Sequence, residues 1–240
     1  MELYLVWVLG TIVIFYAIMR SRRNKKRNDE KDEFVLAQYM ALSGADREEV
    51  MVDKGINGEF AIYKLIQKMN LGGYVLPNLY VPYKTSMTEI DLLWIHKTGV
   101  YVIESKNYSG KVYGYEDSKN WAQYLGGQKY TFYNPISQNQ THINVLAANG
   151  IPKECMSSII VFGSNTTLQK VTVSDAAPPI LTLDELPSYC KKMAKSRKTI
   201  YTDMEVSRLA NDLFQAYALA SDDIKAKHVE RVRLKYGTTA

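Results

Sequence analysis

The sequence has few cysteines: its 240 residues include two, Cys155 and Cys190. Neither belongs to a CxxC pair or stands near histidines at the spacing of a zinc site. A disulfide framework and a structural zinc site are therefore not expected. Two free thiols in a reducing compartment are the simple interpretation.

Outside one short segment, clusters of basic residues are scarce in the sequence. The net charge is +5, and six of the 30 lysines and arginines fall between Arg20 and Arg27. Because much of the excess charge belongs to that run, the rest of the chain offers no obvious basic surface that would indicate a polyanionic partner. With 46% hydrophobic and 23% charged residues, the composition is that of a globular protein and excludes a disordered chain.

Charge is absent between Leu3 and Met19, which are hydrophobic enough to predict a membrane segment. A cleaved signal peptide is the alternative, but it would carry its basic residues before the apolar run, whereas here they follow it. We therefore expect an anchor at 1–20 that contacts the lipid bilayer through residues 3–19. The positive flank predicts a single-pass protein of the cell membrane, with its N-terminus outside and the remaining chain in the cytosol.

Helical and strand patterns alternate after a charged tether with a connecting helix at 21–53. The spacing predicts a helix from Gly55, a strand at 74–81, a hairpin of strands at 89–95 and 100–106, a helix at 134–148 and a strand at 158–162. Helical spacing dominates from Asp184 onward. The expected fold class is α/β, with a mixed β-sheet flanked by helices in one domain at 54–183 and a helical C-terminal extension at 184–240.

Two carboxylates and a lysine lie on the predicted hairpin. Side chains alternate along a strand, so Glu104 and Lys106 project to the same face, and the tight turn can bring Asp91 beside Glu104. Two neighbouring carboxylates raise each other's pKa unless a cation lies between them. This pair suits Mg²⁺ or Mn²⁺, with Lys106 able to position a water or to stabilise charge on a phosphoryl oxygen. A surface ion pair between one of the carboxylates and Lys106 is the simpler alternative.

Other polar residues could extend this site. Glu59 continues the buried face of the first predicted helix, and a third carboxylate could reach the site from there, although a first-turn Glu favoured by the helix dipole is an equal explanation. Gln138 and His142 share a helix face, which is also compatible with a polar surface patch. Among the 18 tyrosines, Tyr108, Tyr113 and Tyr115 are compatible with base stacking, and interior or hairpin packing explains them as easily.

Several short motifs in one order resemble the nuclease-related domain (NERD) family. They are Gly55-Ile56-Asn57-Gly58-Glu59, Asp91, Glu104-Ser105-Lys106-Asn107 with Gly110 and Gly114, Trp121, and Asn134-Pro135-Ile136-Ser137-Gln138-Asn139 with His142 and Leu146. The resemblance covers roughly 54–183, and a family-like tail with His228-Val229 follows. It departs from the related PD-(D/E)XK nucleases in carrying Ile90, not proline, before Asp91.

The resemblance implies a restriction-endonuclease-like core and a chemistry. It implies that Asp91 and Glu104 are metal ligands, that Lys106 is the catalytic lysine, and that Glu59 and Gln138 support the site. The predicted function is a membrane-anchored nuclease that hydrolyses phosphodiester bonds with Mg²⁺ or Mn²⁺, in DNA in preference to RNA. The alternative is a scaffold that binds nucleic acid or protein without cutting, which the lack of a basic surface favours.

Overall fold

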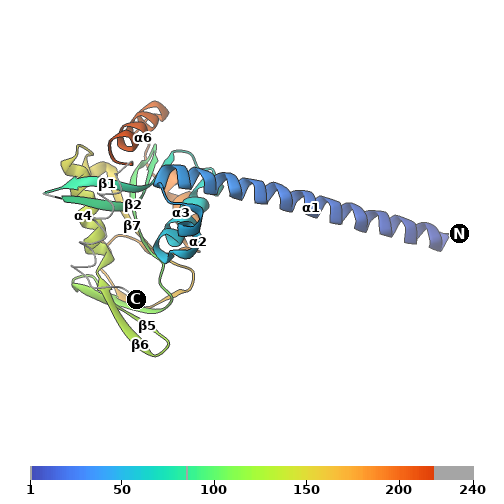
Figure 1. Cartoon of the computed structure of the whole chain (residues 1–240), viewed down its shortest axis with the longest axis horizontal. Helices are drawn as coiled ribbons and strands as arrows, with labels where there is room; N and C mark the ends of the chain where they lie inside the picture. Colours follow the sequence, from blue (N-terminus) through green and yellow to red (C-terminus); the bar gives the residue numbers. More distant parts are fainter. Residues whose placement is uncertain (1, 85, 219–240) are drawn as a thin grey trace. The chain divides into compact units, whose positions relative to one another are not determined.

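The structure is a computed structural model that describes residues 2–84 and 86–218 (Figure 1). The chain divides into two compact units, residues 1–38 and 39–240. Helix α1 (Glu2–Ser43) has 42 residues and includes the segment predicted to be a tether, which is therefore helical. The tail motif at residues 228–229 lies outside the described residues, as does the end of the predicted C-terminal extension.

The prediction of a transmembrane anchor at residues 3–19 is wrong. Within the described ranges, the structure has no helix that combines the length and the apolar character needed to cross a bilayer. The uncharged run has 17 residues and spans only about 26 Å as a helix, less than a hydrocarbon core of about 30 Å. Without this anchor, there is no support for the predicted single-pass topology, bilayer contact and cell-membrane localisation.

A five-stranded mixed sheet with the order β1-β2-β3-β7-β9 forms the centre of the second unit. Strands β1 (Tyr74–Tyr83), β2 (Ser86–His96) and β3 (Gly99–Lys106) are antiparallel neighbours. Strands β7 (Met156–Phe162) and β9 (Ile180–Thr182) continue the sheet in parallel with β3. The predicted hairpin and the mixed α/β class are confirmed. Strand β1 lies at the edge of the sheet, where Pro77, which has no amide hydrogen, can be accommodated because β1 has a neighbouring strand on one side only.

A second sheet of four strands was not predicted as such. Its order is β6-β5-β4-β8, formed by β4 (Gly110–Tyr115), β5 (Asn120–Leu125), β6 (Gln128–Tyr133) and β8 (Thr166–Thr172). One of its faces packs onto Phe162 of β7 through Val112, Trp121 and Phe132. A Cβ on Gly114 would lie 2.2 Å from the Trp121 ring, so the close approach of strand and indole requires glycine there.

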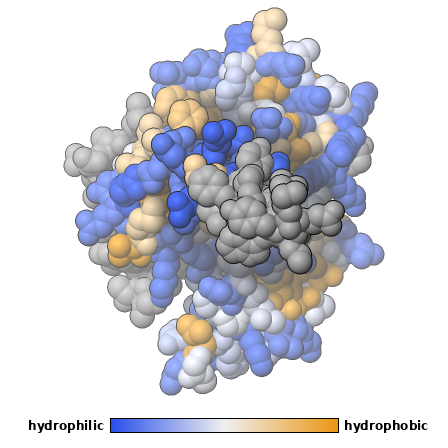
Figure 2. All heavy atoms as spheres, turned by 90° about the vertical axis from the view of Figure 1, so that its right-hand side faces the viewer, coloured by the Kyte–Doolittle hydropathy of each residue, from blue (hydrophilic) through white to orange (hydrophobic). Residues whose placement is uncertain are grey.

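Helices cover both faces of the central sheet (Figure 1). Helices α4 (Pro135–Ala148) and α6 (Asp203–Tyr217) pack their apolar residues onto β1, β2 and β3 in one buried core. Helix α3 (Lys54–Met69) lies on the opposite side of β3, with α2 (Arg47–Val52) before it and α5 (Leu186–Ser196) in contact with it. On the face shown in Figure 2, hydrophilic residues form most of the coloured surface and hydrophobic ones occur in separate groups.

The position of α4 is fixed at its start and in its middle. The side chain of Asn134 accepts a hydrogen bond from the amide of Ile136, which caps the helix, and donates to the carbonyl of Glu116 in the β4–β5 connection. The buried side chain of Asn139 donates to the carbonyl of Val102 in β3 and to Ser158 Oγ in β7, at 2.8 and 2.7 Å. Asn139 therefore fixes the residues on either side of it in the sequence relative to the sheet.

Replacing Asn139 with alanine should destabilise the fold. The carbonyl of Val102 would remain buried without this donor, which costs about 2–3 kcal/mol in the free energy of unfolding. Urea unfolding of the full chain measures the change. The matched control is Gln140→Ala, one residue further and exposed, for which we expect a change within about 0.5 kcal/mol. Equal stability of the two variants would contradict this account of α4.

Candidate active site

The register of β2 and β3 brings Asp91 and Glu104 to adjacent positions. Leu92 pairs with Ile103, so the next positions along the two antiparallel strands are Asp91 and Glu104. Asp91 Oδ2 accepts a hydrogen bond of 2.8 Å from the amide of Ser105. The hairpin therefore holds both carboxylates where the strands leave their paired region, as the sequence predicted.

Glu104 is fully buried and hydrogen-bonded on both oxygens. Lys106 Nζ donates to Oε1 at 2.6 Å, and His142 Nε2 lies 3.2 Å from Oε2. An ionised carboxylate can only accept, so Nε2 is the protonated nitrogen of the imidazole. Burial raises the pKa of Glu104, but Lys106 and His142 outweigh it and hold the pKa below its usual value. Glu104 is thus an anion with paired oxygens.

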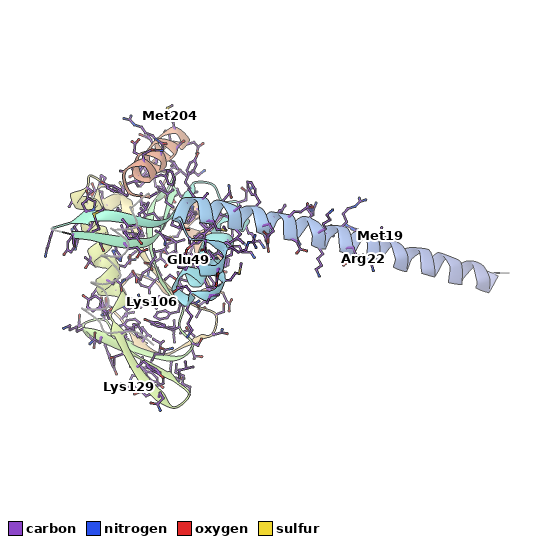
Figure 3. All side chains as sticks on the ribbon, in the orientation of Figure 1. Met19, Arg22, Glu49, Lys106, Lys129 and Met204 are labelled. Carbon is purple, nitrogen blue, oxygen red and sulfur yellow. The ribbon has the colours of Figure 1, made fainter. Side chains whose placement is uncertain are left out.

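Lys106 joins the end of β3 to helix α4. Besides Glu104, its Nζ donates to Gln138 Oε1 at 3.2 Å, and its side chain is 14% exposed. Burial lowers the pKa of the ammonium, but the charge of Glu104 outweighs it and the pKa is raised. Lys106 is therefore protonated and positively charged at physiological pH. In Figure 3, Lys106 lies between the strands of the central sheet and those of the second sheet.

Asp91 carries negative charge that its surroundings compensate poorly. Burial and the repulsion of Glu104 raise the pKa of Asp91 from 3.8 to about 7, against the opposing effects of Lys106, His142 and the amide of Ser105. The sequence predicted that each carboxylate would raise the pKa of the other. Only Asp91 shows the increase, because the ammonium of Lys106 and the imidazole of His142 both lie on Glu104.

Glu59 brings a third carboxylate towards this pair from α3. Its pKa is raised by burial, then by the negative charges of Asp91 and Glu89, while a hydrogen bond from Tyr39 opposes the increase. The Tyr39 hydroxyl lies 3.2 Å from Glu59 Oε2. Electrostatic coupling of Glu59 to Asp91 agrees with the expectation that Glu59 faces inward. Burial and mutual repulsion therefore make both Glu59 and Asp91 costly to ionise when no cation is bound.

A pocket of about 170 Å³ lies next to the site, between α3 and the ends of β3 and β7. Asn107 donates from Nδ2 to the carbonyl of Lys54 at 2.8 Å and lies against Gly58 and Gly163. A Cβ on Gly58 would lie 2.5 Å from the Cβ of Asn107, and one on Gly163 would lie 2.5 Å from its Oδ1. Both glycines are needed so that Asn107 can close this side of the pocket.

The structure adds residues that the sequence did not assign to the site. His142 is the second partner of Glu104, and its position four residues after Gln138 on one helix face was the available signal. Tyr39 lies before the predicted domain at 54–183, and no local pattern connects it with Glu59. The predicted site residues Asp91, Glu104, Lys106 and Gln138 are brought together, with Glu59 coupled to them through charge.

This donor set can hold a divalent cation only in part. Among the residues that the structure describes, no group of three or more His, Cys, Asp or Glu side chains is placed to hold a metal ion. Asp91 and Glu59 have the uncompensated oxygen donors that Mg²⁺ prefers, and Mg²⁺ commonly takes its remaining ligands from water and substrate phosphate. The residues therefore fit an ion that shares its ligands with a bound substrate.

Comparison with known proteins agrees with a nuclease-like class for this mixed α/β fold and its acid–lysine site. The nuclease-related domain (NERD) family matches residues 54–163. A Bacillus anthracis protein described as uncharacterized is 30% identical over 209 residues, which cover 84% of this chain and 94% of that protein. The chain belongs to the NERD family. No solved structure matches the chain.

Replacing Asp91 with asparagine should stabilise the metal-free protein at neutral and basic pH. The pKa of Asp91 is about 7 in the folded chain against 3.8 normally, so the folded state binds the proton more tightly and loses stability as pH rises between these values. Asparagine removes that loss and can still accept from the amide of Ser105. In chelator at pH 8, we expect Asp91→Asn to be more stable than the unmodified protein by about 2–4 kcal/mol.

Urea unfolding at pH 4, 6 and 8 measures this dependence. The difference between the two proteins should shrink towards pH 4, because that pH is close to the usual pKa of 3.8 and the unfolded chain begins to bind the proton that the folded chain already holds. Asp212→Asn in α6 is the matched control, because Asp212 is an exposed aspartate whose removal should change stability by less than about 0.5 kcal/mol at each pH. A difference that does not vary with pH would contradict the charge assigned to Asp91.

Proposed function

We propose that the chain is a metal-dependent nuclease that hydrolyses phosphodiester bonds in nucleic acid, in DNA in preference to RNA. The observation that carries the proposal is the buried Glu104–Lys106 pair, 2.6 Å apart, beside an aspartate whose pKa is raised to about 7. The ion pair between Glu104 and Lys106 could stabilise the fold without Asp91 beside it. The added negative charge is a cost that a bound cation would remove.

Each side chain has a separate part in the proposed reaction. Asp91 and Glu104 would hold Mg²⁺ or Mn²⁺, and Glu59 would add to the negative field that attracts the ion. Such an ion supplies Lewis-acid activation of water and of the phosphoryl oxygen. Lys106, cationic at the strand end, is in a position to stabilise the charge that develops on the phosphate. Gln138 holds the ammonium of Lys106 in place by accepting its second hydrogen bond.

Membership in the family supports this assignment, since the family is described as nuclease-related. We also propose that the central sheet corresponds to the core of the PD-(D/E)XK nucleases, with Ile90 in place of the proline before Asp91. The acidic pair and the lysine come from two neighbouring strands of this sheet, Asp91 from β2 and Glu104 with Lys106 from β3.

A non-catalytic scaffold is the second candidate, and one observation favours it. Both oxygens of Glu104 are already hydrogen-bonded, to Lys106 and to His142. A buried pair of this kind can serve to fix α4 against the sheet without chemistry. To bind an ion, Glu104 would have to share one oxygen between its present partner and the metal.

Cleavage assays with Mg²⁺ and with Mn²⁺ separate the two candidates. On single- and double-stranded DNA and RNA, we expect Lys106→Ala and Glu104→Gln to lower the cleavage rate of the full chain by about 100-fold or more. Glutamine keeps the shape of Glu104 and an acceptor for Lys106. Lys97→Ala is the control for lysine loss, because Lys97 is exposed in the β2–β3 turn, and it should retain full activity.

Thermal unfolding tests ion binding without relying on turnover. An ion at about 100 times its Kd stabilises the folded state by about 2.7 kcal/mol and should raise the Tm by roughly 5–10 °C. The increase should disappear in Asp91→Asn and persist in Lys106→Ala, since Lys106 acts on the phosphate and not on the ion. An unmodified protein that shows no shift and cleaves none of the four substrates would favour the scaffold.

A further inference from the structure

The second sheet has one face buried against β7 and one that is turned away from it. Val112, Trp121 and Phe132 occupy the buried face. Because side chains alternate along strands, the intervening residues of the four strands lie on the other face, here called the outer face. It comprises Lys111, Tyr113 and Tyr115 of β4, Asn120, Ala122 and Tyr124 of β5, Lys129, Thr131 and Tyr133 of β6, and Thr167, Lys170 and Thr172 of β8.

Tyrosine rings are exposed at the centre of this outer face. Tyr115 is 50% exposed and Tyr124 is 40% exposed. The rings of Tyr113 and Tyr124 are in contact, with their centroids 5.3 Å apart. A shallow hollow of about 420 Å³ is lined by these three tyrosines together with Asn120 and Lys129. Exposed rings around a hollow form a surface on which flat apolar groups can stack.

The charge of the outer face is entirely positive. Strands β4, β5, β6 and β8 contain Lys111, Lys129 and Lys170 and no aspartate or glutamate. Two of these lysines lie over tyrosine rings, with Lys129 Nζ 6.0 Å from the centre of Tyr124 and Lys170 Nζ 5.9 Å from that of Tyr115. The neighbouring Glu116 lies beyond the end of β4, where it accepts hydrogen bonds from Ser174. The face thus alternates rings with ammonium groups.

We propose that the outer face binds single-stranded nucleic acid. Unpaired bases would stack on Tyr115 and Tyr124, and the phosphates between them would contact Lys111, Lys129 and Lys170. A duplex keeps the faces of its bases stacked inside and could use only the lysines, so the surface selects single strands. A protein partner would need acidic residues to match the lysines and would not require tyrosines spaced among them.

The inference rests on the proposed nuclease function and adds a substrate class to it. The second sheet is joined to the candidate active site at two points in the chain. Strand β4 starts at Gly110, shortly after Lys106, and β6 ends at Tyr133, shortly before Gln138. A strand bound on the outer face would therefore be held on the sheet that directly connects the elements carrying the catalytic lysine and its glutamine partner.

Fluorescence anisotropy in chelator tests binding without cleavage. The probes are a labelled 20-nucleotide single-stranded DNA of mixed sequence and the same strand in a duplex. We expect the full chain to bind the single strand about tenfold or more tightly than the duplex, and Tyr115→Ala and Tyr124→Ala each to weaken it about fivefold or more. Tyr124→Phe keeps the ring and should bind within about twofold of the unmodified protein. Lys129→Ala and Lys170→Ala should each lower the slope of log K against log salt by about 0.7.

Tyr130→Ala is the matched control for aromatic loss. Tyr130 is 45% exposed on β6 but pairs with Gln123, which places it on the opposite face from Tyr124. Its loss should leave the affinity unchanged. Equal affinity for single strand and duplex, absence of binding, or equal affinity of Tyr115→Ala, Tyr124→Ala and Tyr130→Ala would overturn the inference. So would a concentration-dependent dimer in analytical ultracentrifugation that Tyr115→Ala abolishes in the absence of DNA binding.

These outcomes are separate from a failure of the nuclease proposal. If the chain cleaves with Mg²⁺, loses activity in Lys106→Ala, and shows an unchanged KM for single strands in Tyr115→Ala, the nuclease stands and the outer face is not its substrate surface. If single strands bind as expected in chelator but nothing is cleaved with either ion, the binding surface stands without the nuclease.

Discussion

The complete burial of Glu104 is the constraint on which the rest of the site depends. A carboxylate at this depth is tolerated only if both oxygens are paired, and the pairing partners come from the same strand and from α4. Lys106 and His142 must therefore stay in fixed positions, and Gln138 with them. The positive charge of Lys106 and the hydrogen bond from His142 act mainly on Glu104, so the negative charges of Asp91 and Glu59 remain poorly compensated. The buried anion of Glu104 thus raises the pKa of both Asp91 and Lys106.

Packing around the pair is organised to keep these positions. Asn139 joins α4 to β3 and β7 between the two helix residues that contact the site. The second sheet packs against Phe162 at the end of β7. It follows β3, which carries Lys106, and precedes α4, which carries Gln138. The fold therefore places a rigid support under the charged residues, and it leaves Asp91 half-buried.

Local patterns were enough to predict the hairpin of β2 and β3, helix α4 and the central strand β7, because each has a clear period or cap. They also predicted that Asp91, Glu104 and Lys106 would meet, since a hairpin fixes its own register. The β5–β6 hairpin was missed because its strands mix exposed tyrosines, lysine and glutamine without clean alternation. The different pKa directions of Asp91 and Glu104 could not be predicted, since they depend on Lys106 binding Glu104 and on a further contribution from His142 on a distant helix. The prediction of a bilayer span at residues 3–19 was wrong, because a short uncharged run with a basic flank was taken as sufficient evidence for one.

The central claim is that Asp91 and Glu104 together bind a divalent cation. Crystals grown with Mn²⁺ and measured for its anomalous scattering test this claim directly, because the signal of the ion at its absorption edge is much stronger than that of the sulfur atoms of the protein. The account predicts one strong peak between the carboxylates of Asp91 and Glu104, which is lost in crystals of Asp91→Asn. A well-ordered site with no peak there, and with Glu104 still paired to Lys106 and His142, would contradict it.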